Sequence, residues 1–384
     1  MQHIGCLLRR RNLSRPLAHL HAIRNPARSG NDVVRSTLEP SIDRREQADG
    51  RDDYGLRTVP SDGPTDFRFV AHKRVLGGRF RFVGNSRAML NLVEAAYGGL
   101  PAQTLPATAA RFSVELCLVR RSGPPRKGEP PAPRIGSEGG AVRAVVDASN
   151  HVVIEPARCR ARVVASEDML QHAYHLRCEL IEFAVFILAA RGIGLVPLHA
   201  ACIGWQGRGL LLLGRSGSGK STLALHGLLH GMELLAEDAV FVRPADLLAT
   251  GVPTHLHLRT DALDLVQDDA IRRWIARAPV IRRRSGVEKF ELDLRQGYGR
   301  PAASPLALTG AVFVSDRTSG RADALLTPLR AREAGRLLQA EQPYASGQPG
   351  WHRFKREIVE RGIHQLRRGH HPRDSVDAIR RLLD

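Results

Sequence analysis

The spacing of apolar and polar positions along the chain changes several times, and each spacing predicts a different element. Residues 111–119, RFSVELCLV, alternate between polar and apolar side chains, which is typical of a strand with one buried face. Residues 88–97 instead place Leu90, Val93 and Ala96 on one side of a helix. Further strands are predicted at 67–70, 79–84, 141–149 and 151–156. These segments predict a small α+β domain over residues 65–165, for which we expect a role in substrate recognition.

The second half of the chain alternates apolar runs with helical segments. A helix is predicted from about Asp168 to Ala190, and another after Asp374 closes the chain. Strands are predicted near 197–203, 209–213, 234–242, 256–258, 290–294 and 308–314. This order predicts an α/β domain over residues 166–384, built around a mostly parallel or mixed sheet.

Residues 1–64 are polar, rich in Arg and Asp, and without sustained periodicity, which predicts a disordered tail. The basic start of the chain lacks a long apolar segment and a small-residue cleavage site, so no secretory signal is expected. The most apolar stretch, 179–198, is interrupted by Glu182 and Arg191, which favours a buried helix over a membrane span. The five cysteines form no C-x-x-C pair, which favours a reducing, cytoplasmic location without a disulfide framework or a zinc site.

The formal net charge is +18, from 57 Lys and Arg against 39 Asp and Glu. Such an excess is compatible with a nucleic-acid partner, which would predict steep salt dependence of binding. The basic residues are spread along the chain and no nucleic-acid motif accompanies them, so we interpret the excess as a compositional bias. A basic cluster between Arg272 and Arg284 is interpreted as a solvated helix face, with a mobile substrate loop as the alternative.

Residues 209–222, GLLLLGRSGSGKST, contain the phosphate-binding pattern G-x-x-x-x-G-K-[ST] between an apolar run and a helix-compatible segment. The N–H groups of such a turn, with a helix N-terminus, form a nest for a polyphosphate. Lys220 is expected to reach the β- and γ-phosphates, and the Ser221 hydroxyl to hold Mg²⁺. The predicted nucleotide-binding residues are Gly214, Arg215, Ser216, Gly217, Ser218, Gly219, Lys220, Ser221 and Thr222.

Three polar residues outside this loop are candidates for the chemistry. Glu237 and Asp238 lie in a strongly apolar strand, where unpaired charges cost several kcal/mol. One such carboxylate can hold Mg²⁺, and its neighbour can accept a proton from an attacking hydroxyl. A solvated acidic pair is the alternative, and His199, taken alone, is more typical of a core residue. The chain lacks the LSGGQ signature of transporter ATPases and the N-K-x-D motif of GTPases.

The segment PLHAACIGWQGRGLLLLGRSGSGKSTLALHGLLHGMELLAEDAVFV resembles the catalytic domain of the HPr kinase/phosphorylase family, closely over residues 198–242 and loosely beyond them. That family orders a histidine strand, a second strand, the phosphate loop, a helix and a strand ending in two acids. The resemblance implies that His199 is the active-site histidine, that Glu237 is the catalytic base, and that Asp238 binds Mg²⁺ together with Ser221. The family's first acid is usually Asp, and here it is Glu.

The resemblance implies a P-loop kinase of the HPr kinase type that uses ATP and Mg²⁺ to phosphorylate a hydroxyl, with serine of a small protein or peptide as acceptor. Glu237, His199 and Lys220 are its expected catalytic residues. A small-molecule kinase with the same site is one open alternative. The other is a nucleotide-binding regulator without turnover, which the change from Asp to Glu keeps open. Neither a membrane nor a nucleic-acid partner is expected, and homo-oligomer formation is left open.

Overall fold

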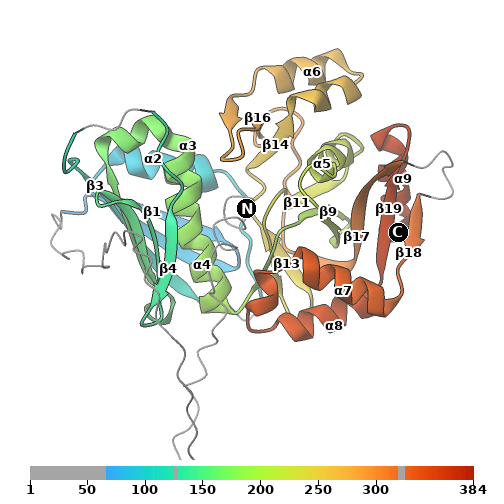
Figure 1. The fold of residues 1–384 in the computed structure, drawn as a ribbon, viewed down its shortest axis with the longest axis horizontal. Helices are drawn as coiled ribbons and strands as arrows, with labels where there is room; N and C mark the ends of the chain where they lie inside the picture. Colours follow the sequence, from blue (N-terminus) through green and yellow to red (C-terminus); the bar gives the residue numbers. More distant parts are fainter. Residues whose placement is uncertain (1–65, 107, 125–127, 319–324) are drawn as a thin grey trace, which may run out of the picture. The chain divides into compact units, whose positions relative to one another are not determined.

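The computed structural model describes residues 66–384 except 107, 125–127 and 319–324. The disordered tail predicted for residues 1–64 lies outside the described residues. The chain has an α/β fold with mixed sheets, as expected (Figure 1). Its described strands form a seven-stranded sheet, called the first sheet below, a nine-stranded second sheet, and a three-stranded third sheet.

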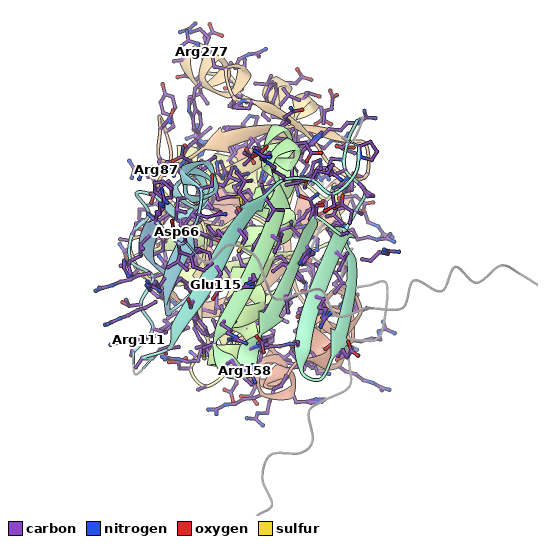
Figure 2. The ribbon with its side chains drawn as sticks, turned by 90° about the vertical axis from the view of Figure 1, so that its left-hand side faces the viewer. Asp66, Arg87, Arg111, Glu115, Arg158 and Arg277 are labelled. Atoms are coloured by element: carbon purple, nitrogen blue, oxygen red, sulfur yellow. The ribbon has the colours of Figure 1, made fainter. Side chains whose placement is uncertain are left out.

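The first sheet has the strand order β1-β2-β3-β7-β6-β5-β4. In β3, Phe112, Val114 and Leu116 are buried, because the predicted alternation points them toward a core shared with the helix α2 (Arg87–Tyr97). The opposite face carries charged side chains such as Arg111 and Glu115 (Figure 2). The strands are β1 (Phe69–Val75), β2 (Gly78–Gly84), β3 (Arg111–Val119), β4 (Arg134–Glu138), β5 (Ala141–Asp147), β6 (Asn150–Glu155) and β7 (Arg160–Ser166).

A long helical segment follows the first sheet, close to the predicted bounds. It consists of the 3₁₀-helix η2 (Glu167–His172), α3 (Ala173–His175), the π-helical η3 (Leu176–Ile181) and α4 (Glu182–Ile193). It ends at Gly194, whose φ of 77° is the left-handed conformation typical of a helix C-terminus. The domain boundary predicted at residue 166 places this segment in the second domain, whereas its buried apolar side chains belong to the same core cluster as those of the first sheet.

The second sheet contains β10, the strand that leads into the phosphate loop. Leu210 and Leu212 of β10 lie in one core cluster and Leu211 and Leu213 in another, so the continuous apolar run is buried on both faces. The helices α5 and α9 contribute to the first of these clusters, and α7 and α8 to the second. The strand order is β11-β9-β10-β17-β13-β12-β8, with β19 paired to β17 and β18 to β19. Strand β17 pairs in parallel with β10 and β19, and the remaining pairs are antiparallel.

The second sheet includes β10 (Arg208–Leu213), β13 (Leu248–Gly251), β17 (Leu306–Thr318), β18 (Leu326–Pro328) and β19 (Ile363–Arg368). The third sheet contains β14 (His255–Arg259), β15 (Val280–Arg282) and β16 (Glu288–Asp293). The helices are α5 (Lys220–Leu229), α6 (Asp269–Ala276), α7 (Ala331–Glu341), α8 (Trp351–Arg361) and α9 (Pro372–Leu383). Among the described helices, none combines the length and the apolar character that crossing a membrane requires.

Two predicted strands of the second sheet are interrupted where their polar residues lie. The predicted strand 197–203 is split into β8 (Val196–Leu198) and β9 (Ala201–Trp205), on either side of His199. The predicted strand 234–242 is split into β11 (Glu233–Ala236) and β12 (Val240–Arg243), on either side of the acidic pair. Because β8 pairs with β12 and β9 with β11, the two interruptions lie opposite each other. The prediction of continuous strands is therefore wrong at these points, where the polar side chains pair with one another instead of entering an apolar ladder.

Candidate active site

The phosphate loop connects β10 to α5, in the strand–loop–helix order that its motif requires. Gly214, Gly217 and Gly219 have φ angles of 130°, 82° and 98°, a region that glycine adopts without strain. A Cβ atom on Gly214 would lie 2.7 Å from the carbonyl oxygen of Val314. Gly219 is the N-cap of α5, so the N-terminus of this helix faces the loop.

The Lys220 ammonium lies on the loop itself. Its Nζ donates to the carbonyl oxygens of Gly214 at 2.7 Å and Arg215 at 3.1 Å. Burial lowers its pKa, and the nearby Asp238 and Glu237 charges act in the opposite direction. The Ser218 hydroxyl oxygen in the same loop is buried and has no hydrogen-bond partner among the described residues. A buried hydroxyl without a partner fits a loop whose polar groups are completed by a bound polyphosphate.

Further cations surround the loop. Arg368 Nη2 donates to the carbonyl oxygen of Gly217 at 3.1 Å, and the Arg259 guanidinium is the nearest group to a Cβ built on Gly217, at 4.0 Å. Arg215 and Ser216, both predicted nucleotide contacts, are exposed. Guanidinium groups bind phosphate oxygens in a bidentate manner, so these positions suit a polyphosphate.

The first acid of the pair contacts the loop serine. Ser221 Oγ donates a short hydrogen bond to Glu237 Oε1, and His257 Nδ1 lies 3.2 Å from the other carboxylate oxygen. Burial is the largest single influence and raises the pKa of Glu237, but the hydrogen bond with His257 together with the nearby His257 and Lys289 lowers the pKa to about 2. Glu237 is therefore an ionised, buried carboxylate that is hydrogen-bonded to Ser221 of the phosphate loop.

The second acid contacts the predicted histidine. His199 Nε2 lies 3.0 Å from Asp238 Oδ1, and Arg283 Nη1 lies 3.7 Å from Oδ2. The pKa of Asp238 is well below its usual value although burial opposes ionisation, and His199 and Arg283 contribute to that lowering. Gln342 holds His199 through its side chain, which accepts from the His199 N–H at 2.8 Å and donates to its carbonyl oxygen at 3.0 Å.

All the residues expected to act together thus lie in one site, but their contacts differ from the expected grouping. The metal site predicted from the resemblance combines Ser221 with Asp238, whereas the hydroxyl of Ser221 donates to Glu237. His199, which the sequence analysis places on a strand, lies in the interruption between β8 and β9 and faces Asp238.

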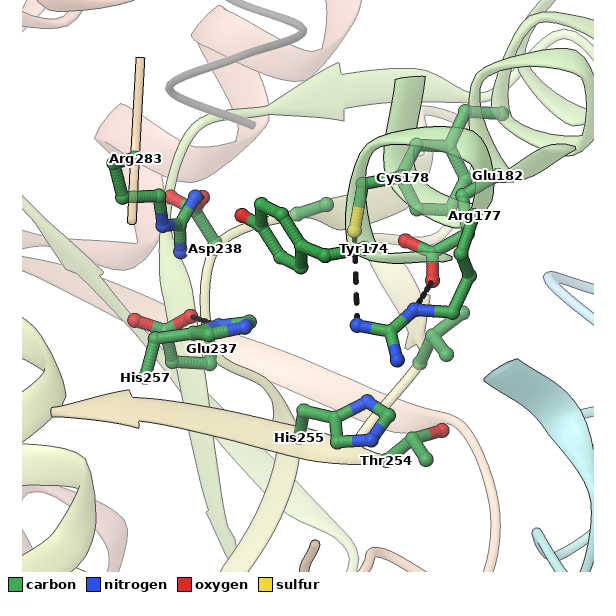
Figure 3. Close-up of a pocket in the computed structure, with 13 residues that line it drawn as sticks. Tyr174, Arg177, Cys178, Glu182, Glu237, Asp238, Thr254, His255, His257 and Arg283 are labelled. Carbon is green, nitrogen blue, oxygen red and sulfur yellow. Dashed lines mark hydrogen bonds and ion pairs between the residues drawn. The ribbon is translucent and has the colours of Figure 1, made fainter. Parts of the chain in front are cut away.

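Several residues of the site were not identified from the sequence. Arg283 belongs to the cluster interpreted as a solvated face, yet it is only 5% exposed and lies next to Asp238 (Figure 3). His257 and Glu291 occupy adjacent strands, with His257 Nε2 at 3.0 Å from Glu291 Oε1, and Arg177 Nη2 donates to the same oxygen. The sequence gives only a weak indication of His257 and Glu291: each is a polar residue between apolar neighbours, in the short strands HLHLR and FELD.

A cavity of about 70 Å³ opens beside the acidic pair. One of its walls comes from the helical segment that packs on the first sheet, where Tyr174, Cys178, Glu182 and Phe186 recur at a spacing of four residues and so share a face. The other walls come from the second and third sheets. The lining residues are Tyr174, Arg177, Cys178, Glu182, Phe186, Glu237, Asp238, Ala239, Val252, Thr254, His255, His257 and Arg283.

In the part of the chain that the structure describes, no group of three or more His, Cys, Asp or Glu residues is arranged to hold a metal ion. Mg²⁺ commonly binds through one or two protein oxygens together with water and phosphate oxygens. The Ser221 hydroxyl and the Glu237 carboxylate supply such a donor set next to the loop. In comparisons with known proteins, the chain matches no family model and no curated protein.

Proposed function

We propose that the protein is an ATP-dependent kinase that transfers the γ-phosphate to a hydroxyl group, with serine of a small protein or peptide as the candidate acceptor. The observation that carries the proposal is the pairing of Ser221 with Glu237, and of His199 with Asp238, at one phosphate loop. A polyphosphate-binding loop beside two ionised carboxylates and a histidine suits phosphoryl transfer to a hydroxyl.

In this proposal the loop N–H groups and Lys220 bind the phosphates, and Ser221 and Glu237 hold Mg²⁺. When bound, Mg²⁺ neutralises charge on the phosphate oxygens. The contacts favour an exchange of the two roles that the resemblance implies for the acids: Glu237 is the proposed Mg²⁺ ligand, and Asp238 is the proposed acceptor of the hydroxyl proton.

The acceptor hydroxyl enters the cavity beside Asp238. As the hydroxyl oxygen forms its bond to the γ-phosphorus, Asp238 accepts the hydroxyl proton and the bond to the departing ADP oxygen breaks. His199 orients Asp238, and the buried Arg283 guanidinium offsets charge on the transferring group. The protein contributes mainly position and electrostatics in such a reaction.

The resemblance to the HPr kinase/phosphorylase family supports the proposal, because β8, β9, β10, the loop, α5 and β11 follow one another in the order that the family uses. The longer side chain of Glu237 reaches the Ser221 hydroxyl. The change from Asp to Glu is thus compatible with turnover.

A small-molecule kinase is the second candidate, and the cavity beside the acidic pair is the observation that favours it. Its lining combines apolar side chains with buried cations and carboxylates, which is typical of sites for small polar ligands.

The test is transfer of label from γ-labelled Mg-ATP, using the full chain with serine-containing peptides and, separately, small hydroxyl compounds. Label should move to one of the two classes, and Lys220→Ala should abolish the transfer. Lys355→Ala, on the distant helix α8, is the matched control and should keep it. Tight ATP binding without transfer or hydrolysis would instead support the regulator, and equal ATP binding by wild type and Lys220→Ala would contradict the nucleotide site.

A further inference from the structure

A line of hydrogen bonds runs from the phosphate loop through Glu237 to the helical segment of the first sheet. Ser221 donates to Glu237 Oε1, and the other carboxylate oxygen lies 3.2 Å from His257 Nδ1. His257 Nε2 lies 3.0 Å from Glu291 Oε1, which also accepts from Arg177 Nη2. The two acidic side chains, Glu237 and Glu291, alternate with His257 and Arg177 along this line. Of its five residues, only Ser221 and Glu237 were predicted from the sequence.

The fold accounts for these positions. His257 on β14 and Glu291 on β16 are register partners in an antiparallel pair, so their side chains share one face of the third sheet. Arg177 comes from the π-helical turn η3, a rare conformation that is frequent at functional sites. The side chains of Glu237, His257, Glu291 and Arg177 are 6%, 12%, 10% and 8% exposed. Charged groups buried to this degree are tolerated only when they are paired.

His257 lies between two carboxylates, with one ring nitrogen facing each of them. A carboxylate oxygen accepts hydrogen bonds, and Nδ1 and Nε2 of His257 each lie within hydrogen-bond distance of one of these oxygens. One oxygen of Glu237 is thereby occupied by His257, and the other is directed at Ser221.

We propose that His257, held in place by Glu291 and Arg177, is a positioning residue that keeps Glu237 directed at Ser221 and so prepares the magnesium side of the site. The proposal rests on the proposed function, in which Ser221 and Glu237 hold Mg²⁺. His257 acts through Glu237. Its loss should therefore weaken the binding of Mg-ATP and leave the metal-free contacts between ATP and the loop intact.

Two substitutions at His257 separate positioning from mere packing. The amide nitrogen of Asn takes about the place of Nδ1, so His257→Asn keeps a donor for Glu237. The amide nitrogen of Gln takes about the place of Nε2, so His257→Gln keeps only the donor for Glu291. A residue that only fills space would show no such order between the two variants.

The measurement is the affinity of the full chain for a fluorescent ATP analogue, with Mg²⁺ and again in EDTA. His257→Gln should weaken binding with Mg²⁺ about tenfold, which corresponds to about 1.4 kcal/mol, because the hydrogen bond to Glu237 is lost. Binding in EDTA should change less than about twofold. His257→Asn should stay within about threefold of wild type under both conditions. His352→Gln, at an exposed position on α8, is the control.

Equal affinities of wild type and His257→Gln for the Mg²⁺ complex would overturn the proposal. So would equal losses with Mg²⁺ and in EDTA, because that pattern indicates a structural role. Circular dichroism checks that each variant is folded. If His257→Gln does not fold, Glu291→Gln takes its place, and it should likewise weaken binding of the analogue with Mg²⁺ but not in EDTA. A folded wild-type protein that binds the analogue under neither condition would refute the proposed function itself, which distinguishes the two failures.

Discussion

The side chain of Gln342 holds the turn that carries His199, and its replacement by leucine should cost both stability and phosphoryl transfer. Gln342 is the C-cap of α7 and is 2% exposed. Its amide makes hydrogen bonds of 2.8 Å and 3.0 Å to the N–H and carbonyl of His199. Gln342→Leu keeps roughly the volume of the side chain and removes both polar groups, so the loss is one of hydrogen bonds and not of packing.

The expected magnitude follows from the two groups left without a partner. An unsatisfied buried backbone group costs about 1–3 kcal/mol, so two of them give about 2–6 kcal/mol. The His199 side chain is 15% exposed, and water near this turn should compensate in part. We therefore expect a loss of about 2–4 kcal/mol in the free energy of unfolding. Transfer should fall as well, because the turn positions His199 against Asp238.

Urea denaturation of the full chain, with the midpoint and the slope fitted together, measures the loss. Gln267→Leu is the matched control, since Gln267 is exposed. Its free energy of unfolding should change by less than about 0.5 kcal/mol. A loss below about 1 kcal/mol in Gln342→Leu would refute the argument that this amide holds the turn.

Three further changes test other parts of the structure. Gly214→Ala places a Cβ 2.7 Å from a carbonyl oxygen of β17 at a φ of 130°, so nucleotide binding should be lost. Gly335→Ala, which has open space around it in α7, is the control and should leave nucleotide binding unchanged. Equal nucleotide binding by the two variants would contradict the geometric argument. The pKa of Glu237 is about 2 when folded against 4.5 otherwise, so its stabilisation is complete above pH 4.5 and lost toward pH 2. Wild type should therefore lose more stability than Glu237→Gln between about pH 5 and about pH 3 in urea titrations, and parallel losses would argue against the shift. Glu179 is 0% exposed and pairs with Arg284 at 2.6 Å, so Glu179→Gln should cost about 3–5 kcal/mol in urea unfolding, and a cost below about 1 kcal/mol would show that the pair is dispensable.

Local pattern was sufficient for the elements whose causes are local. The strands predicted at 141–149 and 151–156 form the antiparallel pair of β5 and β6, and the turn that joins them lies at Ala148 and Ser149. The phosphate loop follows its strand and precedes its helix within a short segment, so the motif and its context could be predicted together. The C-terminal helix, predicted to follow Asp374, begins earlier: His371 is its N-cap, and Asp374 is its third residue and closes the capping box.

The pairing of the site residues was decided by contacts between distant segments. The interruptions at His199 and at the acidic pair arise because β8 and β9 pair with β12 and β11, which no local pattern specifies. His257 meets Glu291 through the register of β14 and β16, and Arg177 reaches Glu291 from 114 residues away. Sequence periodicity reports which face of an element is buried, and it carries no information on which buried charges will meet. Burying a charged group is unfavourable unless it pairs with another polar or charged group. Which groups form these pairs is decided by the tertiary structure.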